Sequence, residues 1–269
     1  MMHSSTDPAP TVRIVQDRID QLRLDHLAAL LDRDPPAPGD PLPALWHWLF
    51  CIDPIRRSKL GPDGHELVGG FIPSLPASHR MWAGGDVRFL QPLHVGDEIT
   101  RESHIAKVDC KQGSAGDLWF VTIRHDFKRG EASVLVEDQN LVYMANVPRG
   151  RPSINPPSGT IMLTERFDDV SLQRYSALTL NSHRIHFDRH YCRDTMRDER
   201  LVVHAPLLAT CLADQIELDH RLSRLRYKMI SATREDETVC FAINHASRAA
   251  FVTSSQGELR LLAQFEVAD

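Results

Sequence analysis

The sequence predicts an α+β fold in which two antiparallel sheets each wrap round a buried helix. Three observations lead to this fold class: two runs of four strand-like segments, an apolar helical segment before each run, and a proline-rich segment between them. Apolar residues make up 42% of the 269-residue chain and charged residues 25%, a balance that excludes disordered and fibrous proteins.

The segment over residues 148–160 is rich in proline and glycine and is predicted to be a linker. It separates a first half, residues 1–147, from a second half, residues 161–269, and each half is near the usual size of a small domain. We expect the first half to be structural and to contribute to a substrate pocket, and the second half to carry the chemistry.

The first half contains one run of predicted strands. Partly alternating apolar and β-branched residues, separated by turns that contain glycine, predict an antiparallel meander. Its strands are residues 87–90, 98–108, 118–123 and 133–137.

The second half repeats this order, with predicted strands at residues 224–227, 238–243, 250–253 and 258–267. A Gly-Glu turn precedes the last strand of each run, at Gly130 and at Gly257. The shared order suggests a duplicated unit, and a chance likeness of two meanders is the alternative.

One apolar segment precedes each run. Residues 206–216 are rich in helix formers, are apolar on nearly every side and begin with Pro206, which suits the first turn of a helix. A helix that is apolar all round is buried. The counterpart in the first half is residues 44–50, which are bulkier and more aromatic. A long antiparallel sheet wrapped round one buried helix is the hot-dog arrangement, so we expect a double hot-dog with its two sheets joined edge to edge.

Charge and cysteine content exclude several classes of function. The formal net charge is −5 and the basic residues are dispersed, which argues against a nucleic-acid partner. The five cysteines form no C-x-x-C pair, so neither a disulfide framework nor a thiolate zinc site is indicated. No apolar stretch approaches the roughly 18 residues of a membrane helix, and the first residues lack the order of a signal peptide. We therefore expect a cytoplasmic protein with a small-molecule ligand and no membrane partner.

The most unusual segment is residues 178–188, Leu-Thr-Leu-Asn-Ser-His-Arg-Ile-His-Phe-Asp. It resembles the hydratase motif of the MaoC-like, or hydratase-2, hot-dog enzymes, in which an Asp and a His five positions apart bracket a turn into a short helix. Asn181 and His186 occupy those two positions. The residues Asn-Ser-His-Arg-Ile-His resemble in particular the branch of type 2 hydroxyacyl-thioester dehydratases and their relatives that hydrate mesaconyl-CoA or itaconyl-CoA. We call residues 178–188 the hydratase motif.

Residues 45–48, 80–85, 88–97 and 203–209 extend the resemblance across most of the chain. The resemblance implies an enoyl-CoA hydratase or hydroxyacyl-thioester dehydratase, a carbon–oxygen lyase that takes an acyl-CoA substrate and uses no cofactor and no metal. Its expected reaction is the reversible hydration of a short branched dicarboxylic enoyl-CoA, either itaconyl-CoA or mesaconyl-CoA, to citramalyl-CoA. Because hot-dog units usually expose sheet edges that pair, a homodimer is also expected.

The chemistry of hydration explains the residue types. Adding water across an enoyl thioester requires a base for the water, and the imidazole of His186 can perform that task. An amide can orient water but cannot take its proton, so we expect Asn181 to position the water that His186 activates. The start of the 206–216 helix should stabilise the thioester oxygen through a backbone N–H of Ala205, Leu207 or Leu208. With an unperturbed imidazole, activity should fall below a pH of about 6 to 7.

Residues near Asn181 and His186 are expected to contact the substrate, and for each of them another role is also possible. Arg184 is expected to pair with a substrate carboxylate or a CoA phosphate, and the alternative is a surface salt bridge to Asp188. His183 is expected near the substrate, although the spacings of three and four residues from His183 to His186 and on to His190 could also present imidazoles to zinc. His204 is expected to line the site beside Ala205, and the alternative is a capping or packing role.

Two features of the first half are interpreted as structural. The four tryptophans could form an acyl pocket, but a place in the core is the preferred interpretation. His65 and Glu66 lie among glycines in a predicted loop, for which a lid is favoured over catalysis.

Three other functions remain as alternatives. They are a 3-hydroxyacyl-thioester dehydratase of lipid synthesis, a thioesterase, and a non-catalytic acyl-thioester-binding hot-dog protein. Asn181 disfavours the thioesterase, which generally uses a carboxylate, and the missing Asp keeps the non-catalytic alternative open.

Overall fold

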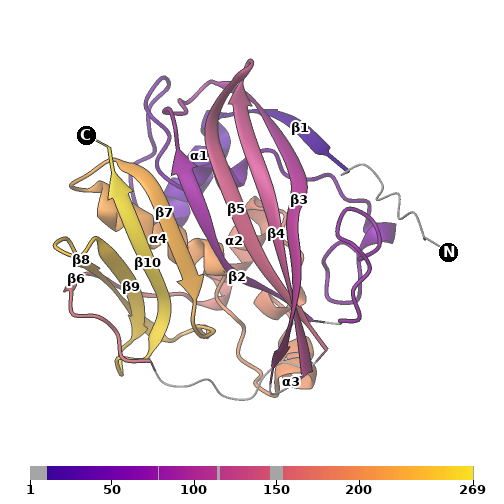
Figure 1. Ribbon diagram of the computed structural model, residues 1–269. Coiled ribbons are helices and arrows are strands. Elements are labelled where there is room, and N and C mark those ends of the chain that lie inside the picture. Colours follow the sequence, from indigo (N-terminus) through magenta and orange to yellow (C-terminus); the bar gives the residue numbers. More distant parts are fainter. Residues whose placement is uncertain (1–10, 78, 114–115, 146–153, 269) are drawn as a thin grey trace.

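The computed structural model describes residues 11–77, 79–113, 116–145 and 154–268. Their ten strands form one antiparallel sheet in the order β1-β3-β4-β5-β2-β7-β10-β9-β8-β6, and the helices cover its concave side (Figure 1). The strands are β1 Arg13–Arg18, β2 His79–Phe89, β3 Glu98–Gly113, β4 Gly116–Arg129, β5 Ala132–Met144, β6 Thr160–Arg166, β7 Leu222–Met229, β8 Thr238–Asn244, β9 Ala249–Ser254 and β10 Leu259–Val267. The helices are α1 Gln21–Leu30, α2 Asp169–Leu178, α3 Arg189–Met196 and α4 Ala205–Glu217, with short 3₁₀ turns η1 Trp46–Leu49, η2 Arg57–Lys59 and η3 Arg184–His186.

The two meanders are joined edge to edge, as the sequence predicted. Strand β2 of the first half pairs with β7 of the second, with Gly84 opposite Lys228 and Gly85 opposite Tyr227. A Cβ on Gly85 would lie 2.9 Å from the Tyr227 ring, so this junction needs a residue without a side chain. The eight predicted strands all fall on observed ones, whereas the sequence did not indicate β1 and β6, the two outermost strands of the sheet.

Helix α4 confirms the predicted buried helix. Ten of its residues are buried, and it packs on β7, β8 and β9. Pro206 lies in the first turn, where its missing N–H costs nothing.

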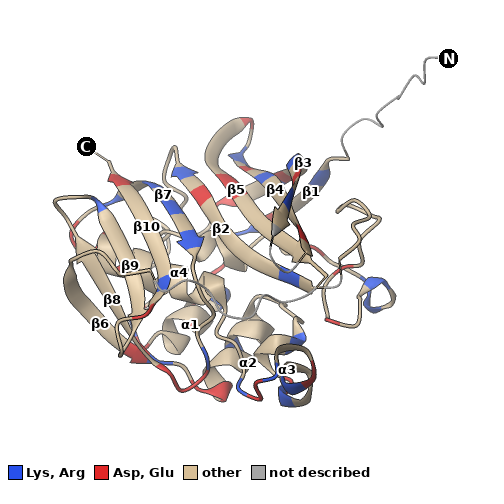
Figure 2. Cartoon of the chain, turned by 60° about the horizontal axis from the view of Figure 1, so that its bottom comes forward, with Lys and Arg blue, Asp and Glu red and all other residues tan. Residues whose placement is uncertain are grey.

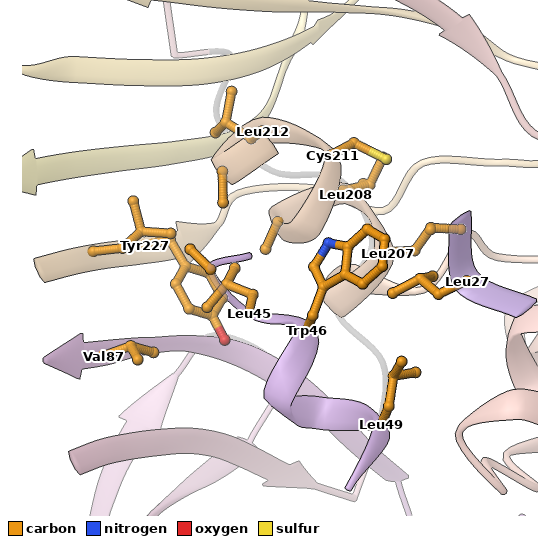
Figure 3. Packing of buried hydrophobic residues seen from close by; sticks show 14 of the residues in the cluster. Leu27, Leu45, Trp46, Leu49, Val87, Leu207, Leu208, Cys211, Leu212 and Tyr227 are labelled. Carbon is orange, nitrogen blue, oxygen red and sulfur yellow. The ribbon is translucent and has the colours of Figure 1, made fainter. Parts of the chain in front are cut away.

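The predicted helix over residues 44–50 is much shorter than expected. Only the 3₁₀ turn Trp46–Leu49 forms, because Leu45 adopts a left-handed conformation with φ 67° and Phe50 is extended. Trp46 lies in the core: its indole is fully buried among α1 and α4 (Figure 3). Its Nε1 donates to Asp214 Oδ1 at 3.2 Å.

The surface carries charge of both signs. Figure 2 shows Lys and Arg interspersed with Asp and Glu along the strands and loops that face the viewer. All five cysteines are free thiols. In the part of the chain that the structure describes, no helix combines the length and hydropathy needed to cross a membrane. The predicted linker, residues 148–160, lies partly outside the described residues.

Candidate active site

The hydratase motif runs from the end of α2 through a tight turn and η3 to the start of α3. Leu180 takes a left-handed conformation with φ 49°, and the Asn181 N–H returns to the Ser176 carbonyl at 2.8 Å. Asp188 closes the motif by accepting the Tyr191 N–H at 2.9 Å, which caps α3. The motif is therefore a fixed turn between two capped helices.

A cavity of about 1490 Å³ opens beside this turn and the first residues of α4. Four of the predicted site residues border it: Asn181, His183, His186 and Ala205. Arg184 and His204 do not border it. Its other walls include β2, β4 and β5 of the first half and α3, β7 and the loop after β7 of the second half, so both halves of the chain contribute to the cavity.

His186 is held in one orientation. Its ring is buried, and Nδ1 lies 2.7 Å from the Val202 carbonyl oxygen. Since a carbonyl only accepts, Nδ1 carries the proton and Nε2 is left with a lone pair. Burial lowers the pKa of His186 to about 4, so the imidazole is neutral at physiological pH and can accept a proton.

His204 lies behind His186 rather than in the cavity. The two rings stack with centroids 3.6 Å apart, and His204 Nε2 is 2.9 Å from the Ser176 hydroxyl. Burial, and then the neighbouring His186, depress the pKa of His204 far below its usual value. This geometry favours the packing alternative for His204, in which it supports the ring of His186.

The side-chain amide oxygen of Asn181 already accepts a hydrogen bond. Its Oδ1 accepts the backbone N–H of His183 at 3.1 Å, which assigns the other end as NH₂. The side chain borders the cavity, so the group it can offer to a bound water is a donor.

The start of α4 offers backbone donors, as expected. The Leu208 N–H already donates to the His204 carbonyl at 3.2 Å. Of the two remaining candidates, Leu207 is fully buried, whereas Ala205 borders the cavity. Ala205 is thus the N–H best placed to meet a thioester oxygen, aided by the helix dipole.

Arg184 forms the surface salt bridge to Asp188 that was the alternative to a substrate contact. Its Nη2 lies 2.7 Å from Asp188 Oδ2, and its guanidinium also donates to the Pro62 carbonyl at 3.1 Å. The side chain stacks over the Tyr191 ring. These contacts tie the hydratase motif to the first half and leave Arg184 outside the cavity.

The sequence interpretation undervalued His65. Its ring borders the cavity and lies 4.1 Å, centroid to centroid, from His183, which in turn lies 5.5 Å from His186. The suggested partner Glu66 instead pairs with Arg13 at 2.8 Å, while His65 Nδ1 lies 3.1 Å from Asp63 Oδ2. Burial and then the nearby positive Arg80 lower the pKa of His65 to about 4, against the opposing effect of Asp63.

The loop that carries His65 is docked on the motif through Gly64. The Ser182 hydroxyl donates to the Gly64 carbonyl at 2.6 Å, and the Arg184 N–H donates to the Asp63 carbonyl at 2.9 Å. Gly64 has φ +93°, and a Cβ there would lie 1.8 Å from the Ser182 carbonyl oxygen. Only glycine allows this approach.

Arg80 is a second residue that sequence reasoning did not single out as functional. Its side chain borders the cavity and hydrogen-bonds to Tyr143. It joins none of the ion pairs found among the described residues. Its charge acts on the His183 ring, whose pKa is lowered by burial first and then by His65, His186 and Arg80. Arg80 therefore places a positive charge near the catalytic candidates, where it also acts on the Asp63 carboxylate.

A second cavity of about 900 Å³ adjoins the first and shares Asn181, His65 and Arg80 with it. Trp48 and Trp82 border this second cavity, whereas Trp46 belongs to the core. Its walls also carry buried polar groups, among them Glu137, which accepts from Trp48 Nε1 at 3.0 Å. The cavity is thus a mixed polar and aromatic space.

Comparison with known proteins agrees with the geometry. The family model described as "Hydroxyacyl-thioester dehydratase type 2" matches residues 45–235. A mesaconyl-C(4)-CoA hydratase of Chloroflexus aurantiacus is 39% identical over 206 residues, 74% of each chain. A mitochondrial hydroxyacyl-thioester dehydratase type 2 of Schizosaccharomyces pombe is 24% identical over 257 residues, 81% of this chain and 85% of the relative.

Solved structures share the fold. HtdX of Mycobacterium tuberculosis superimposes with a TM-score of 0.70 at 15% identity, over 95% of this chain and 100% of that one. Another M. tuberculosis protein, described as having a double hotdog fold, gives 0.57 at 12% identity over 96% and 95% of the two chains. The predicted double hot-dog is confirmed. The chain belongs to the type 2 hydroxyacyl-thioester dehydratase family and is an enzyme of the hydratase and dehydratase class.

Proposed function

We propose that this enzyme hydrates the double bond of a short branched dicarboxylic enoyl-CoA, with mesaconyl-C4-CoA as the first candidate and itaconyl-CoA as the second, to form citramalyl-CoA. The observation that carries the proposal is His186: its Nδ1 is bound by the Val202 carbonyl, and its ring borders a cavity at the first turn of α4. The name of the 39% identical relative supports the choice of acyl group.

In the proposed reaction of mesaconyl-C4-CoA, whose double bond is conjugated with the thioester, Nε2 of His186 takes a proton from a water as the water oxygen bonds to the β carbon. The π electrons move toward the α carbon and the thioester oxygen, where the N–H of Ala205 stabilises the developing charge. The resulting imidazolium is acidic, because the site lowers its pKa to about 4, and it returns the proton to the α carbon. No proton is gained or lost overall.

The substrate carboxylate needs a cation, and Arg80 is better placed than Arg184 to supply it. In mesaconyl-C4-CoA the carboxylate is attached to the carbon that the water attacks, so it must lie close to His186. Arg184 is engaged by Asp188, whereas Arg80 borders both cavities and its charge reaches His183. A guanidinium can bind a carboxylate through two hydrogen bonds.

The alternative is a dehydratase for 3-hydroxyacyl thioesters of lipid synthesis, and the hydroxyacyl-thioester dehydratase type 2 of S. pombe supports dehydration as the reaction. A long acyl chain would require a long apolar tunnel. The second cavity carries Glu137, His125 and Arg101 on its walls, which favours a short polar acyl group.

The test follows the loss of enoyl-thioester absorbance with mesaconyl-C4-CoA, crotonyl-CoA and a long-chain enoyl-CoA, and the formation of citramalyl-CoA by chromatography with itaconyl-CoA, whose double bond is not conjugated with the thioester. We expect kcat/KM to be highest for one of the two dicarboxylic esters. Faster hydration of crotonyl-CoA would contradict the acyl group proposed, and preference for the long chain would favour the lipid dehydratase.

Three organisational features also remain proposals. We retain the division into residues 1–147 and 161–269, a cytoplasmic location, and a homodimer. The outer strands β1 and β6 are sheet edges that could pair with a second copy. Light scattering of the purified protein would test the dimer.

A further inference from the structure

Asn181 cannot supply the second hydrogen-bond acceptor that a catalytic water needs. A nucleophilic water has two hydrogens to donate and one lone pair to spare besides the one that attacks the β carbon. His186 Nε2 takes one hydrogen, and the Asn181 NH₂ group donates to the spare lone pair. The second hydrogen finds no acceptor on Asn181, because its Oδ1 is occupied by the His183 N–H at 3.1 Å.

His65 brings an acceptor to this cavity from the other half of the chain. Its ring borders the cavity together with Asn181 and His186, and it packs against His183 at 4.1 Å. The loop is held in place by the Ser182 hydroxyl on the Gly64 carbonyl and by the Arg184 N–H on the Asp63 carbonyl. The position of His65 is therefore fixed by the same turn that holds Asn181.

Asp63 sets which nitrogen of His65 is the acceptor. Its Oδ2 accepts from His65 Nδ1 at 3.1 Å, and its Oδ1 accepts the backbone N–H of His65 at 3.0 Å. A carboxylate accepts only, so Nδ1 carries the proton and Nε2 keeps a lone pair. The arrangement repeats what the Val202 carbonyl does for His186.

We propose that His65 accepts the second hydrogen of the catalytic water, and that Asp63 is the positioning residue that makes it an acceptor. The proposal rests on the proposed function. The water proton that is transferred still goes to His186 Nε2 and then to the α carbon, while the other O–H stays bonded to oxygen and becomes the product hydroxyl. His65 thus fills the place that a carboxylate at position 181 would occupy.

The same cluster has a competing interpretation as a metal site. Asp63, His65 and His183 each offer a ligand atom, and these atoms lie within 4.8 Å of one another. Two observations favour the water. The carboxylate of Asp63 is already used in orienting His65, and the positive Arg80 acts on both His65 and His183.

The decisive variant is Asp63→Asn. The backbone N–H of His65 requires the amide oxygen at the Oδ1 position, so the NH₂ group must face Nδ1 and donate to it. His65 then carries its proton on Nε2 and becomes a donor. We expect kcat to fall about 100-fold, with KM within threefold of wild type, because a wrong tautomer at an intact site removes catalysis rather than binding. The imidazole ¹⁵N shifts of His65 should show that the proton has moved to Nε2.

Two further variants keep the test valid if Asp63→Asn is unstable. His65→Gln can still present an amide oxygen, so we expect it to retain at least tenfold more kcat than His65→Leu. Asp219→Asn is the control: it also replaces a carboxylate by an amide, but at an exposed residue, and it should leave kcat unchanged. Each variant is assayed with whichever enoyl-CoA the wild-type enzyme hydrates fastest, so an error in the acyl group does not affect the result.

Three results would overturn the inference. The first is a kcat within threefold of wild type for Asp63→Asn with the ¹⁵N shifts exchanged. The second is equal loss in His65→Gln and His65→Leu. The third is wild-type activity that disappears with a chelator and returns with zinc, which would establish the metal interpretation. A wild-type enzyme that hydrates none of the enoyl-CoA esters would refute the proposed function together with this inference.

Discussion

The imidazole rings of His186 and His204 stack with centroids 3.6 Å and planes 20° apart. His204 is in turn held by the Ser176 hydroxyl. The stack orients His186 toward the cavity and buries it, and burial is the main reason that its pKa falls to about 4. The expectation of an ordinary imidazole pKa is therefore corrected, and the consequences can be measured.

The pH profile should reflect this low pKa. His186 must be neutral to accept a proton, so kcat/KM for hydration should stay level from about pH 8 to about pH 5.5 and be halved near pH 4. In the dehydration direction His186 must also start neutral, because it takes the α proton before it returns that proton to the leaving hydroxyl, so kcat/KM for dehydration should follow the same pH profile. Samples returned from each pH to neutral pH control for irreversible loss. A hydration profile that is halved between pH 6 and 7 would contradict the assignment.

The two motif residues should differ in importance. His186→Ala removes the base and should lower kcat by about 10³-fold, within the usual range for a general base. Asn181→Ala removes a donor to the water and should cost about tenfold. Asn181→Asp should also be slower than wild type, because a carboxylate gives the water a third acceptor and no donor. A faster Asn181→Asp enzyme would show that the water is held differently.

Replacing Arg80 should change substrate preference. We expect Arg80→Gln to lower the ratio of kcat/KM for mesaconyl-C4-CoA over crotonyl-CoA by about 100-fold, in line with the loss of one partner of a buried charge pair. Arg184→Gln is the matched control, since its guanidinium pairs with Asp188 outside both cavities. If Arg184→Gln lowered this kcat/KM ratio and Arg80→Gln did not, Arg184 would be the residue that binds the substrate carboxylate, as the sequence led us to expect.

Gly64→Ala should damage both stability and activity. Strain at a positive φ costs about 1 to 3 kcal/mol, and the new Cβ must also displace the Ser182 backbone. Gly96→Ala is the control, because φ there is +104° and nothing lies within 4 Å of the added Cβ. Urea unfolding should show a larger loss for Gly64→Ala, and only Gly64→Ala should lower kcat. Equal losses of stability would mean that the loop is not tightly docked.

Three buried histidines and the partly buried His65 should make the protein sensitive to acid. His65, His183, His186 and His204 all have folded-state pKa values below the unfolded value near 6.5. As the pH falls below 6.5, the unfolded chain binds protons first, so stability is present above that pH and is lost toward pH 4. Each imidazole contributes up to about 1.4 kcal/mol per pH unit in this window.

Urea unfolding at pH 7.5 and 5.5 measures this loss. The His183→Gln variant removes one titrating group and should lose less stability between the two pH values than wild type does. An unfolding free energy that is the same at both pH values would show that these imidazoles are protonated in the folded protein.

Much of the fold could be predicted from local patterns. Alternation in the strands and the all-round apolar character of residues 206–216 are properties of short windows, and both were located correctly. The outermost strands β1 and β6 were not indicated, because neither of these edge strands has a fully buried residue. The helix expected at 44–50 is limited to one turn by the left-handed Leu45 and the extended Phe50, which the sequence pattern did not indicate.

The sequence by itself determined the class of chemistry, because Asn181 and His186 lie in one short motif whose spacing is a local property. It could not decide which other side chains reach that motif. His65 and Arg80 are more than 100 residues away in the chain, and they arrive only because Gly64 permits contact with Ser182 and because β2 pairs with β7. Arg184, although adjacent to the catalytic candidates in sequence, is turned away by Asp188. Residues that are close in the sequence determine the helices and strands. Packing between segments that are distant in the sequence decides which side chains reach the active site.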